Sequence, residues 1–477
     1  MTRSSWGAAG TAAVVLAATL LACPKTTSGA PAAASMDRQV ARVQLHRSGN
    51  RGQAYLPRSR ADGRKEPGSF RLRPIRVIRP DGDGRDNVRS NLYPIDVDGD
   101  RRFELLQFNG YRFMRVYRQD GRKLWEVRNP RGRVHRSHVH RDTLAVVDVD
   151  GDRRQEIVHC WVEPGTRAKS LVVRRGDNGR VVRRVRLSGQ GTNSECQIAA
   201  FKVPGRSMPI LLVAHEGGRC ARPSLDLFAR TVAFDVGLRR LWERTTCDAG
   251  HYAWPLDANG DGAAEGIFVG KYLLSPSGRL RCTLAGWGRD HVDSMVVADL
   301  VPSRRGYEVA AVGLSGTRIH SASTCARIAT VNGVRNAQHV SAARFSRTAA
   351  APTLMIRGRA KSSTAPNRVY RVDGQGRLQG SFLDRSLRHL TPTINANLDG
   401  AAAAEDMVTW FGQVIGPDGQ VRLGTSWYWN LQKLTRAERR LSVYDQWTNA
   451  PVVIDLDRDG RDEIITWGRR VIAIGGR

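Results

Sequence analysis

Short apolar runs rich in Val, Ile and Leu recur along the chain, and turns that contain Gly and Asp separate them. Leu144–Val149 and Pro451–Leu456 each lead into an acidic loop, and Glu463–Trp467 leaves one. β-Branched residues gathered in short runs between turn residues are typical of strands. The acidic loops are therefore expected to connect one strand to the next.

Four of these loops carry Asp or Asn at positions 1, 3 and 5 and Glu at position 9. A hard cation such as Ca²⁺ takes about six to eight oxygen ligands, and these side chains supply oxygen. An EF-hand opens with the same Asp-x-Asp-x-Asp pattern, but it closes with a later Glu and lies between helices. The sequence thus predicts calcium in strand–loop–strand sites with the ligands Asp96, Asp98, Asp100 and Glu104; Asp148, Asp150, Asp152 and Glu156; Asp257, Asn259, Asp261 and Glu265; and Asp455, Asp457, Asp459 and Glu463.

Two weaker copies of the loop follow the same pattern with fewer charges. One begins at Asp299 and ends at Glu308, and the other begins at Asn395. A lower count of charged ligands is expected to weaken calcium binding. The second copy supplies three further predicted metal ligands, Asn395, Asn397 and Asp399, before Glu405.

The loop starts define a repeat. They fall at residues 96, 148, 257, 299, 395 and 455, so the intervals are 52, 109, 42, 96 and 60 residues. The two doubled intervals each contain a degenerate copy, Ile198–Val203 in one and Ser341–Phe345 in the other. Four strands per unit and a period of about 40 to 50 residues are typical of a β-propeller. We therefore predict an all-β chain with a single propeller of eight four-stranded blades, seven being the alternative, and with calcium loops between the first and second strands of several blades.

The last unit is incomplete. After Ile464–Trp467 only the run Arg470–Ile474 remains before the chain ends. The segment before the first loop offers two candidates for the missing strand, Val40–Leu45 and Ile75–Ile78. We expect the propeller to occupy residues 37–477, with 37–90 as the segment that closes the ring against the C-terminal blade.

The N-terminus has the features of an export signal. Residues 1–23 combine a basic start, an apolar stretch at Ala12–Ala18 and a cysteine, Cys23. The apolar stretch is too short to span a membrane, and its end resembles a bacterial lipoprotein signal in which the cysteine is acylated. We expect an exported protein lipid-anchored through Cys23 to the periplasmic or cell-surface face of the envelope, with residues 24–36 as a flexible tether.

Six cysteines remain when Cys23 is set aside, which suits disulfide bonds in an exported protein. Six cysteines allow fifteen pairings. The pairing of nearest neighbours in sequence would join adjacent blades, and no Cys/His spacing suggests zinc. This nearest-neighbour pairing joins Cys160 with Cys196, Cys220 with Cys247 and Cys282 with Cys325.

The chain carries a formal net charge of +30, although many of its acidic residues lie in the calcium loops. A strongly basic surface attracts polyanions, and outside the cytoplasm these include acidic polysaccharides. A solvated, arginine-rich surface without a specific partner is the other interpretation. No nucleic-acid motif is present, so we expect no nucleic-acid partner and a monomer that binds an acidic polysaccharide or an extracellular protein.

Five of the eleven histidines lie six or eight residues ahead of a loop start. On a propeller this place is the start of the innermost strand, so these side chains would surround the mouth of the central channel, on the face opposite the acidic loops. Either they form a ligand pocket or each fills a structural slot beside a loop carbonyl. The predicted ligand-binding residues are His140, His251, His291, His339 and His389 with Trp287 and Trp447, and Arg289 lies near the same ends.

The acidic loops resemble the FG-GAP/VCBS repeats of integrin α-chain propellers and many secreted bacterial proteins, over about residues 85–477. More specifically, Asp257–Glu265, Trp287–Asp299 and Arg305–Val309 resemble three ordered segments of the eight-bladed rhamnogalacturonan lyases. The segment Gly288-Arg-Asp-His-Val-Asp293 departs from the family's Gly-His-Gly-Asp-Ala pattern, and Asp299-Leu-Val-Pro302 lacks one acidic residue of the family's Asp-Leu-Asp-Pro.

The resemblance implies a choice between two functions. A lyase of this type would use calcium or Arg289 to neutralise a uronate carboxylate, while His251, His291 or His339 removes the C5 proton. A binder would hold the polysaccharide, or a protein partner, in the same central pocket without cleaving it. Because the departures fall in the most specific lyase segment, we expect a calcium-stabilised, surface-anchored propeller lipoprotein that binds, with the lyase as the alternative.

Overall fold

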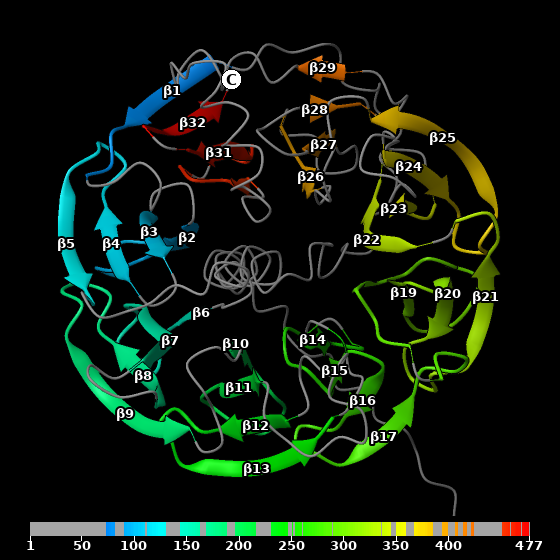
Figure 1. Cartoon of the computed structure of the whole chain (residues 1–477), viewed down its shortest axis with the longest axis horizontal. Helices are drawn as coiled ribbons and strands as arrows, with labels where there is room; N and C mark the ends of the chain where they lie inside the picture. Colours follow the sequence, from blue (N-terminus) through cyan, green and yellow to red (C-terminus); the bar gives the residue numbers. More distant parts are fainter. Residues whose placement is uncertain are drawn as a thin grey trace, which may run out of the picture.

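The computed structural model shows a ring of small sheets arranged around a centre (Figure 1). No described helix is long and apolar enough to cross a membrane. The model describes residues 73–476 apart from 82–89, 110–111, 130–143, 163–167, 188–195, 216–229, 247–249, 251–252, 260, 289, 335, 345–349, 359–366, 385–393, 399–405, 409–413, 417–420, 424–450, 458 and 469.

The described strands form eight four-stranded antiparallel sheets, each built from strands that follow one another in sequence, with the last sheet completed from the N-terminal side. These sheets are the blades of a propeller, as the repeat predicted, and eight is the number of units counted there. Blades 1 to 4 consist of β2 (Asn91–Ile95), β3 (Glu104–Asn109), β4 (Phe113–Tyr117) and β5 (Lys123–Arg128); β6 (Leu144–Val147), β7 (Glu156–Val162), β8 (Lys169–Arg174) and β9 (Val181–Leu187); β10 (Cys196–Phe201), β11 (Ile210–His215), β12 (Arg230–Phe234) and β13 (Arg240–Thr245); and β14 (Ala253–Leu256), β15 (Gly266–Val269), β16 (Tyr272–Leu274) and β17 (Leu280–Thr283).

Blades 5 to 8 repeat this order around the other half of the ring (Figure 1). They consist of β18 (Ser294–Ala298), β19 (Glu308–Gly313), β20 (Gly316–Ser321) and β21 (Arg327–Val331); β22 (Ala337–Ala343), β23 (Thr353–Gly358), β24 (Asn367–Val372) and β25 (Leu378–Asp384); β26 (Ile394–Ala396), β27 (Asp406–Val408), β28 (Val414–Ile415) and β29 (Val421–Leu423); and β30 (Val452–Ile454), β31 (Glu463–Trp467), β32 (Ile472–Gly476) and β1 (Arg73–Ile78).

The first strand of each blade lies nearest the centre and the fourth lies on the rim (Figure 1). Burial follows this order: all six residues of β3 are buried, whereas the fourth strand β5 is exposed at both ends and half-buried between them. Each inner strand contacts a neighbouring blade on both of its faces. Because successive side chains of a strand point to opposite faces, most residues of these strands are buried and apolar. The outer strands are free on one side and carry charged residues, which protects an unpaired sheet edge.

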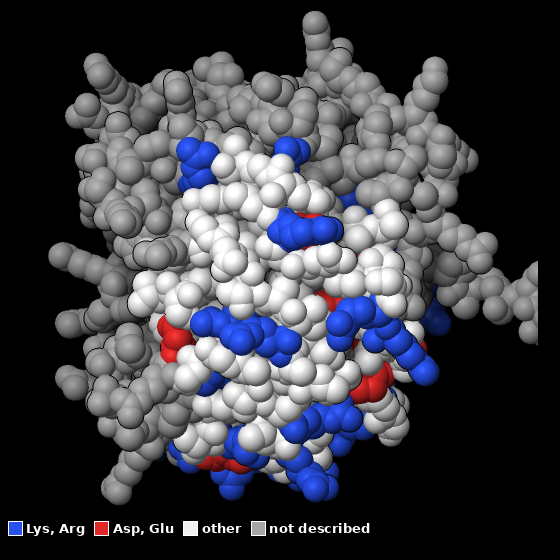
Figure 2. Space-filling model, turned by 90° about the vertical axis from the view of Figure 1, so that its right-hand side faces the viewer, with Lys and Arg blue, Asp and Glu red and all other residues white. Residues whose placement is uncertain are grey.

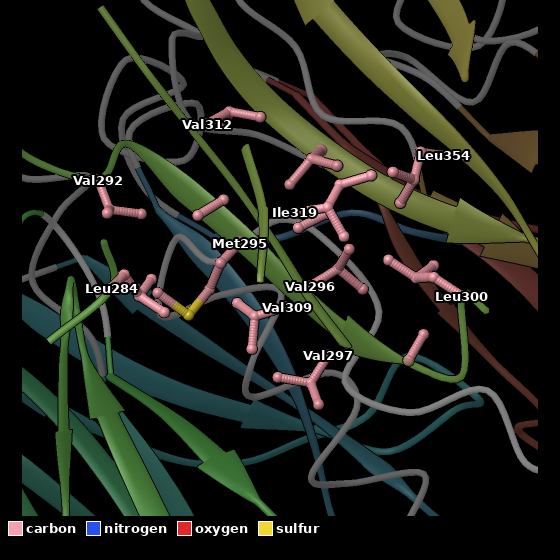
Figure 3. Packing of buried hydrophobic residues seen from close by; sticks show 14 of the residues in the cluster. Leu284, Val292, Met295, Val296, Val297, Leu300, Val309, Val312, Ile319 and Leu354 are labelled. Carbon is pink, nitrogen blue, oxygen red and sulfur yellow. The ribbon is translucent and has the colours of Figure 1, made fainter. Parts of the chain in front are cut away.

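The core consists of apolar side chains packed between successive blades. Met295, Val296 and Val297 of β18 and Val309 of β19 belong to one buried cluster, which extends to Leu354 of blade 6 (Figure 3). A second cluster joins blades 8, 1 and 2. Since the clusters cross blade boundaries, the blades stabilise one another and do not form separate cores.

The outer strands add a second, polar contact between neighbouring blades. Trp125 on β5 donates a hydrogen bond from Nε1 to the Gly176 carbonyl of blade 2 at 2.7 Å. Trp242 on β13 donates in the same way to the Pro276 carbonyl of blade 4 at 2.8 Å. The next blade's turn glycine, Gly179, has φ of 73°, and a Cβ there would lie 2.8 Å from the Trp125 ring. Glycine is therefore required twice at this turn, for its φ and for the close approach of the indole.

Two disulfides also join adjacent blades. Cys160 of β7 bonds to Cys196 of β10, and Cys282 of β17 bonds to Cys325 beside β20. Both disulfides are among the pairings that the sequence predicted, which join cysteines adjacent to each other in the order of the chain. Cys220 and Cys247 lie outside the described residues.

The ring is closed by strands from the two ends of the chain, which lie side by side (Figure 1). β1 pairs with β32, with Ile78 opposite Ile472 and Val77 opposite Ala473. This confirms the closure predicted for Ile75–Ile78, whereas the other candidate, Val40–Leu45, lies outside the described residues. The Ile78 side chain also lies beside Gly121 in the turn of blade 1, where an added Cβ atom would be in contact with it.

Deletion of residues 468–477 removes β32, the strand that carries the hydrogen bonds between β31 and β1. Because blade 8 then cannot close the ring, we expect the whole propeller to lose its melting transition, not one blade alone. Scanning calorimetry of the truncated and full-length proteins checks this. A truncated protein with an unchanged transition would show that the ring does not depend on closure.

Candidate functional site

Four clusters of carboxylates lie at the turns between the first and second strands of blades 1, 2, 4 and 8. In each cluster three carboxylate oxygens from different residues lie within 4.8 Å of one another. Carboxylates at this spacing repel one another unless a cation or protons lie between them. The clusters are Asp96, Asp98 and Glu104; Asp148, Asp150 and Glu156; Asp257, Asp261 and Glu265; and Asp455, Asp457 and Glu463.

The loop in blade 1 shows how the backbone positions these groups. Asp96 accepts hydrogen bonds from the amides of Gly99 at 2.7 Å and Arg101 at 2.9 Å, so its carboxylate closes the turn. Glu104 reaches back along the loop and accepts the Val97 amide at 3.2 Å. Gly99 and Arg101 both have positive φ, of 80° and 69°, which wraps the chain tightly around Asp96.

The same bonds recur in the other loops. The closing glutamate always accepts the amide of loop position 2, from Val149 at 3.1 Å, Ala258 at 2.6 Å and Leu456 at 2.7 Å. The position 5 aspartate differs between the loops. In all four loops it accepts an amide two residues later at 2.7 to 2.8 Å, but only Asp261 of blade 4 belongs to its three-residue cluster, in the loop where position 3 is Asn259.

Burial makes the ionised form costly for the closing glutamates of blades 1, 2 and 8. Desolvation raises the pKa of Glu104 and of Glu156 from 4.5 to about 7, and that of Glu463 to about 8, with a smaller contribution from the neighbouring aspartates. Desolvation also raises the pKa of Asp96. The Oε1 atom of Glu156 is buried without a hydrogen-bond donor. A cation would relieve both penalties, so the residues fit a divalent metal.

The two weaker loops behave differently from the four clusters. In blade 5, Glu308 accepts the amides of Leu300 and Val301, both at 3.0 Å, and desolvation raises the pKa of its carboxyl. In blade 7, Asn395 lies within β26 and pairs with Met407, so the loop starts two residues later than predicted, at Asn397. Asp399 and Glu405 lie outside the described residues.

A polar cluster lies at the other end of the inner strand of blade 5. His291 Nε2 lies 3.2 Å from Asp293 Oδ1, and Gln338 of blade 6 donates to Asp293 Oδ2 at 3.0 Å. The segment before it is fixed by Asp290, which accepts the Ser315 amide at 2.8 Å. β18 follows His291 and precedes Asp299, so this cluster and the acidic loops lie at opposite ends of the strand.

The predicted histidine ring is only partly tested by the described residues. His291 lies in the entry segment before β18, whereas His339 is the third residue of β22 and is buried there. The two therefore do not occupy equivalent places, contrary to the prediction. Trp287 is buried in the core cluster of blades 4 to 6, with the Arg318 guanidinium 4.6 Å from its ring centroid. Outside the described residues lie Cys23, His140, His251, Arg289, His389 and Trp447.

Two glutamines take part in these sites and were missed in the sequence. Gln338 bonds Asp293 from the next blade, and Gln155 bonds Asp96 across another blade boundary. Both partners lie far away in sequence, so spacing within one repeat does not reveal them. The only signal is position: Gln155 directly precedes the closing glutamate of its loop.

The chain is similar in sequence to the rhamnogalacturonan exolyase YesX of Bacillus subtilis, with 26% identity over 298 residues. The match covers 50% of this chain and 47% of that protein, so the chain aligns with about half the length of this relative. No protein-family model matches the chain.

Solved structures of rhamnogalacturonan lyases have the same fold. The exotype lyase YesX superposes with a TM-score of 0.56 at 17% identity, covering 81% of this chain and 72% of that one. The PL11 lyase of Bacillus licheniformis gives 0.55 at 16% identity, covering 85% and 75%. At these identities the likeness shows a shared propeller architecture.

The raised pKa values predict an unusual pH dependence for the metal-free protein. A carboxyl whose folded-state pKa exceeds its unfolded value favours the folded state when protonated, so stability is lost as pH rises from about 4.5 to 8. In chelator we expect the melting temperature to fall across this range, and calcium to reduce the fall. Glu156→Gln, which cannot ionise, should show a smaller fall in chelator. A melting temperature that is constant or rises with pH in chelator would contradict the prediction.

Proposed function

We propose that the chain is a calcium-stabilised β-propeller that binds an acidic polysaccharide of the rhamnogalacturonan class. The observation that carries this proposal is the sequence similarity to a rhamnogalacturonan exolyase over half of the chain. The net charge of +30 supports it, because an extended basic surface attracts a polyanion. Lys and Arg outnumber Asp and Glu on the described part of the side shown in Figure 2.

Calcium is the metal that best suits the acidic loops. Their ligands are carboxylate oxygens, which favour hard cations, and the sites have no thiol or imidazole ligand that would favour zinc. Asp96, Asp98 and Glu104 would hold the ion in blade 1, with equivalent residues in blades 2, 4 and 8. The ion would neutralise the crowded carboxylates and thereby join the first two strands of the blade.

Export supports the choice of partner. The N-terminal sequence with Cys23 favours a lipoprotein anchored to the bacterial envelope, and two disulfides suit an oxidising compartment. In that setting the protein would be a monomer, held to the membrane by lipid alone. An extracellular protein is the other partner considered from the sequence.

The face opposite the acidic loops is the proposed binding face. His291 lies there with 17% of its side chain accessible, beside the buried Asp293, and Gln338 connects Asp293 to blade 6. Imidazole, carboxylate and amide groups can all hydrogen-bond sugar hydroxyls. Because these residues lie near the inner ends of two neighbouring blades, the polysaccharide would lie across a blade boundary.

Lyase activity is the second candidate, and the His291–Asp293 contact favours it. Asp293 can hold the imidazole with one nitrogen toward the carboxylate and the other toward substrate. In β-elimination the base takes the C5 proton of a uronate, a C4–C5 double bond forms, and the C4–O bond to the leaving sugar breaks. This route needs a group that neutralises the uronate carboxylate, for which Arg289 or calcium is proposed.

Binding can be tested by the retention of the protein on rhamnogalacturonan at physiological salt. His291→Ala removes a polar group of the proposed face, and we expect it to weaken retention about tenfold, as for loss of a hydrogen bond to a charged group. Val182→Ala, on the exposed outer strand β9, leaves the charge of the basic surface unchanged, so it is the control and should retain the wild-type affinity. Equal retention of both variants would place the binding surface elsewhere.

Lyase activity can be tested directly, because β-elimination creates an unsaturated uronate that absorbs in the ultraviolet. Wild type should produce this absorbance from rhamnogalacturonan with calcium if the second candidate is correct, and His291→Ala should lower the rate by about 10²- to 10⁴-fold. No absorbance from rhamnogalacturonan or other pectins would remove the lyase and leave the binder.

A further inference from the structure

A pair of hydrogen bonds joins the acidic loop of blade 1 to that of blade 2. The backbone amide of Gln155 donates to the backbone carbonyl of Asp96 at 2.9 Å. In return, the backbone amide of Asp96 donates to the side-chain oxygen Oε1 of Gln155 at 2.9 Å. Both residues are buried, with 2% of Asp96 and 7% of Gln155 exposed. Two bonds in opposite directions fix the relative position and orientation of the two backbones.

The partners of this bridge are directly connected to ligands of both loops. Asp96 is itself a member of the blade 1 cluster, and Gln155 precedes Glu156, the closing glutamate of the blade 2 cluster. The bridge is therefore made by the backbone of one cluster member, Asp96, and lies one residue from a member of the other cluster, Glu156. When the blade 1 loop closes on a cation, the backbone of Asp96 can shift. The bridge to Gln155 would transmit this shift to the backbone that orients Glu156.

Other blade boundaries provide natural comparisons. Between blades 7 and 8 the same double bridge forms: the Asp462 amide donates to the Asn397 carbonyl at 2.8 Å, and the Asn397 amide to Asp462 Oδ2 at 2.7 Å. Between blades 3 and 4 the amide of Ala264 bonds the Lys202 carbonyl at 2.7 Å, but alanine provides no side-chain acceptor. Among these three described boundaries, only that between blades 1 and 2 has an acidic cluster on both sides.

Independent evidence for a ligand comes from Glu156. This residue is 1% exposed, and its Oε2 accepts the Val149 amide while its Oε1 is buried without a donor. A carboxylate oxygen of Glu156 lies within 4.8 Å of those of Asp148 and Asp150. A buried acceptor without a donor beside two further carboxylates is suited to a cation.

We propose that Gln155 is a positioning residue that couples the two loops, so that calcium in the blade 1 loop raises the affinity of the blade 2 loop for calcium. This inference rests on the proposed calcium binding. The first ion orders Asp96 and, through the bridge, the peptide before Glu156. The second ion then binds a loop whose closing ligand is already ordered, and it loses less conformational entropy on binding.

The coupling is measured by calorimetric titration with calcium chloride, in a background where Asp257→Asn and Asp455→Asn weaken the other two loops. Adding Asp98→Asn, in the blade 1 loop, should lower the affinity of the blade 2 loop at least about fivefold. Because coupling is reciprocal, Asp150→Asn should lower the affinity of the blade 1 loop by the same factor. This pair of variants leaves Gln155 unchanged.

Substitutions of Gln155 test its role directly. Gln155→Met keeps the length of the side chain but removes Oε1, so the loops should still bind calcium but without coupling. Gln155→Asp should restore at least part of the coupling, because Asp462 occupies the equivalent place at the boundary of blades 7 and 8. Melting in chelator shows whether each variant folds.

The outcomes separate this inference from the proposed function. Two loops that bind calcium independently in the background with Gln155 intact would overturn the coupling and leave calcium binding in place. Equal coupling in wild type and a folded Gln155→Met would overturn the role of Gln155. A titration without heat or stabilisation by calcium in the unsubstituted protein would overturn calcium binding itself, and the coupling with it.

Discussion

Repulsion between carboxylates is the constraint on which the rest of this structure depends. At four turns between inner strands, three carboxylates are brought within 4.8 Å of one another, and the closing glutamates Glu104, Glu156 and Glu463 are buried. Backbone amides of the same loops donate hydrogen bonds to these carboxylates and so hold them close together. Protons or a cation must compensate the charge, and at neutral pH a cation does so better. The loops thus determine how stable each strand pair is.

Neighbouring blades depend on these turns because the same loops carry the contacts between blades. The Asp96 backbone bonds Gln155 of the next blade, and equivalent bonds recur at two other boundaries. At the rim, the indoles of Trp125 and Trp242 and the Cys282–Cys325 disulfide connect blades without any metal, and the Cys160–Cys196 disulfide does so between buried strands nearer the centre. The ring therefore has contacts beside the acidic loops near one end of its inner strands, and further contacts that involve no acidic loop. The opposite ends, where His291 and Asp293 lie, remain available for a ligand.

Much of this architecture could be predicted from local sequence, because each repeat contains its own turn residues and acidic loop. The positions of the four clusters, the closing strand at Ile75–Ile78 and two disulfide pairs all follow from such patterns. The start of the blade 7 loop could not be predicted in this way. Asn395-Ala-Asn397 and Asn397-Leu-Asp399 both fit the loop pattern, and they are offset by two residues. The expected place of His339 depended on its distance from the degenerate loop of blade 6. That loop has no acidic residues that would fix the register of the repeat. Gln155 and Gln338 bond partners 59 and 45 residues away, which only the folded ring brings together.

The acidic loops are proposed to hold calcium ions that connect the strands of the blades. Anomalous diffraction from crystals grown in calcium, recorded at a long wavelength, tests it most directly because it locates the ions. The account predicts peaks between the carboxylates of the loops that begin at Asp96, Asp148, Asp257 and Asp455, with oxygen ligands at about 2.3 to 2.6 Å. Loops that keep their carboxylates within 4.8 Å but show no anomalous peak in saturating calcium would contradict it.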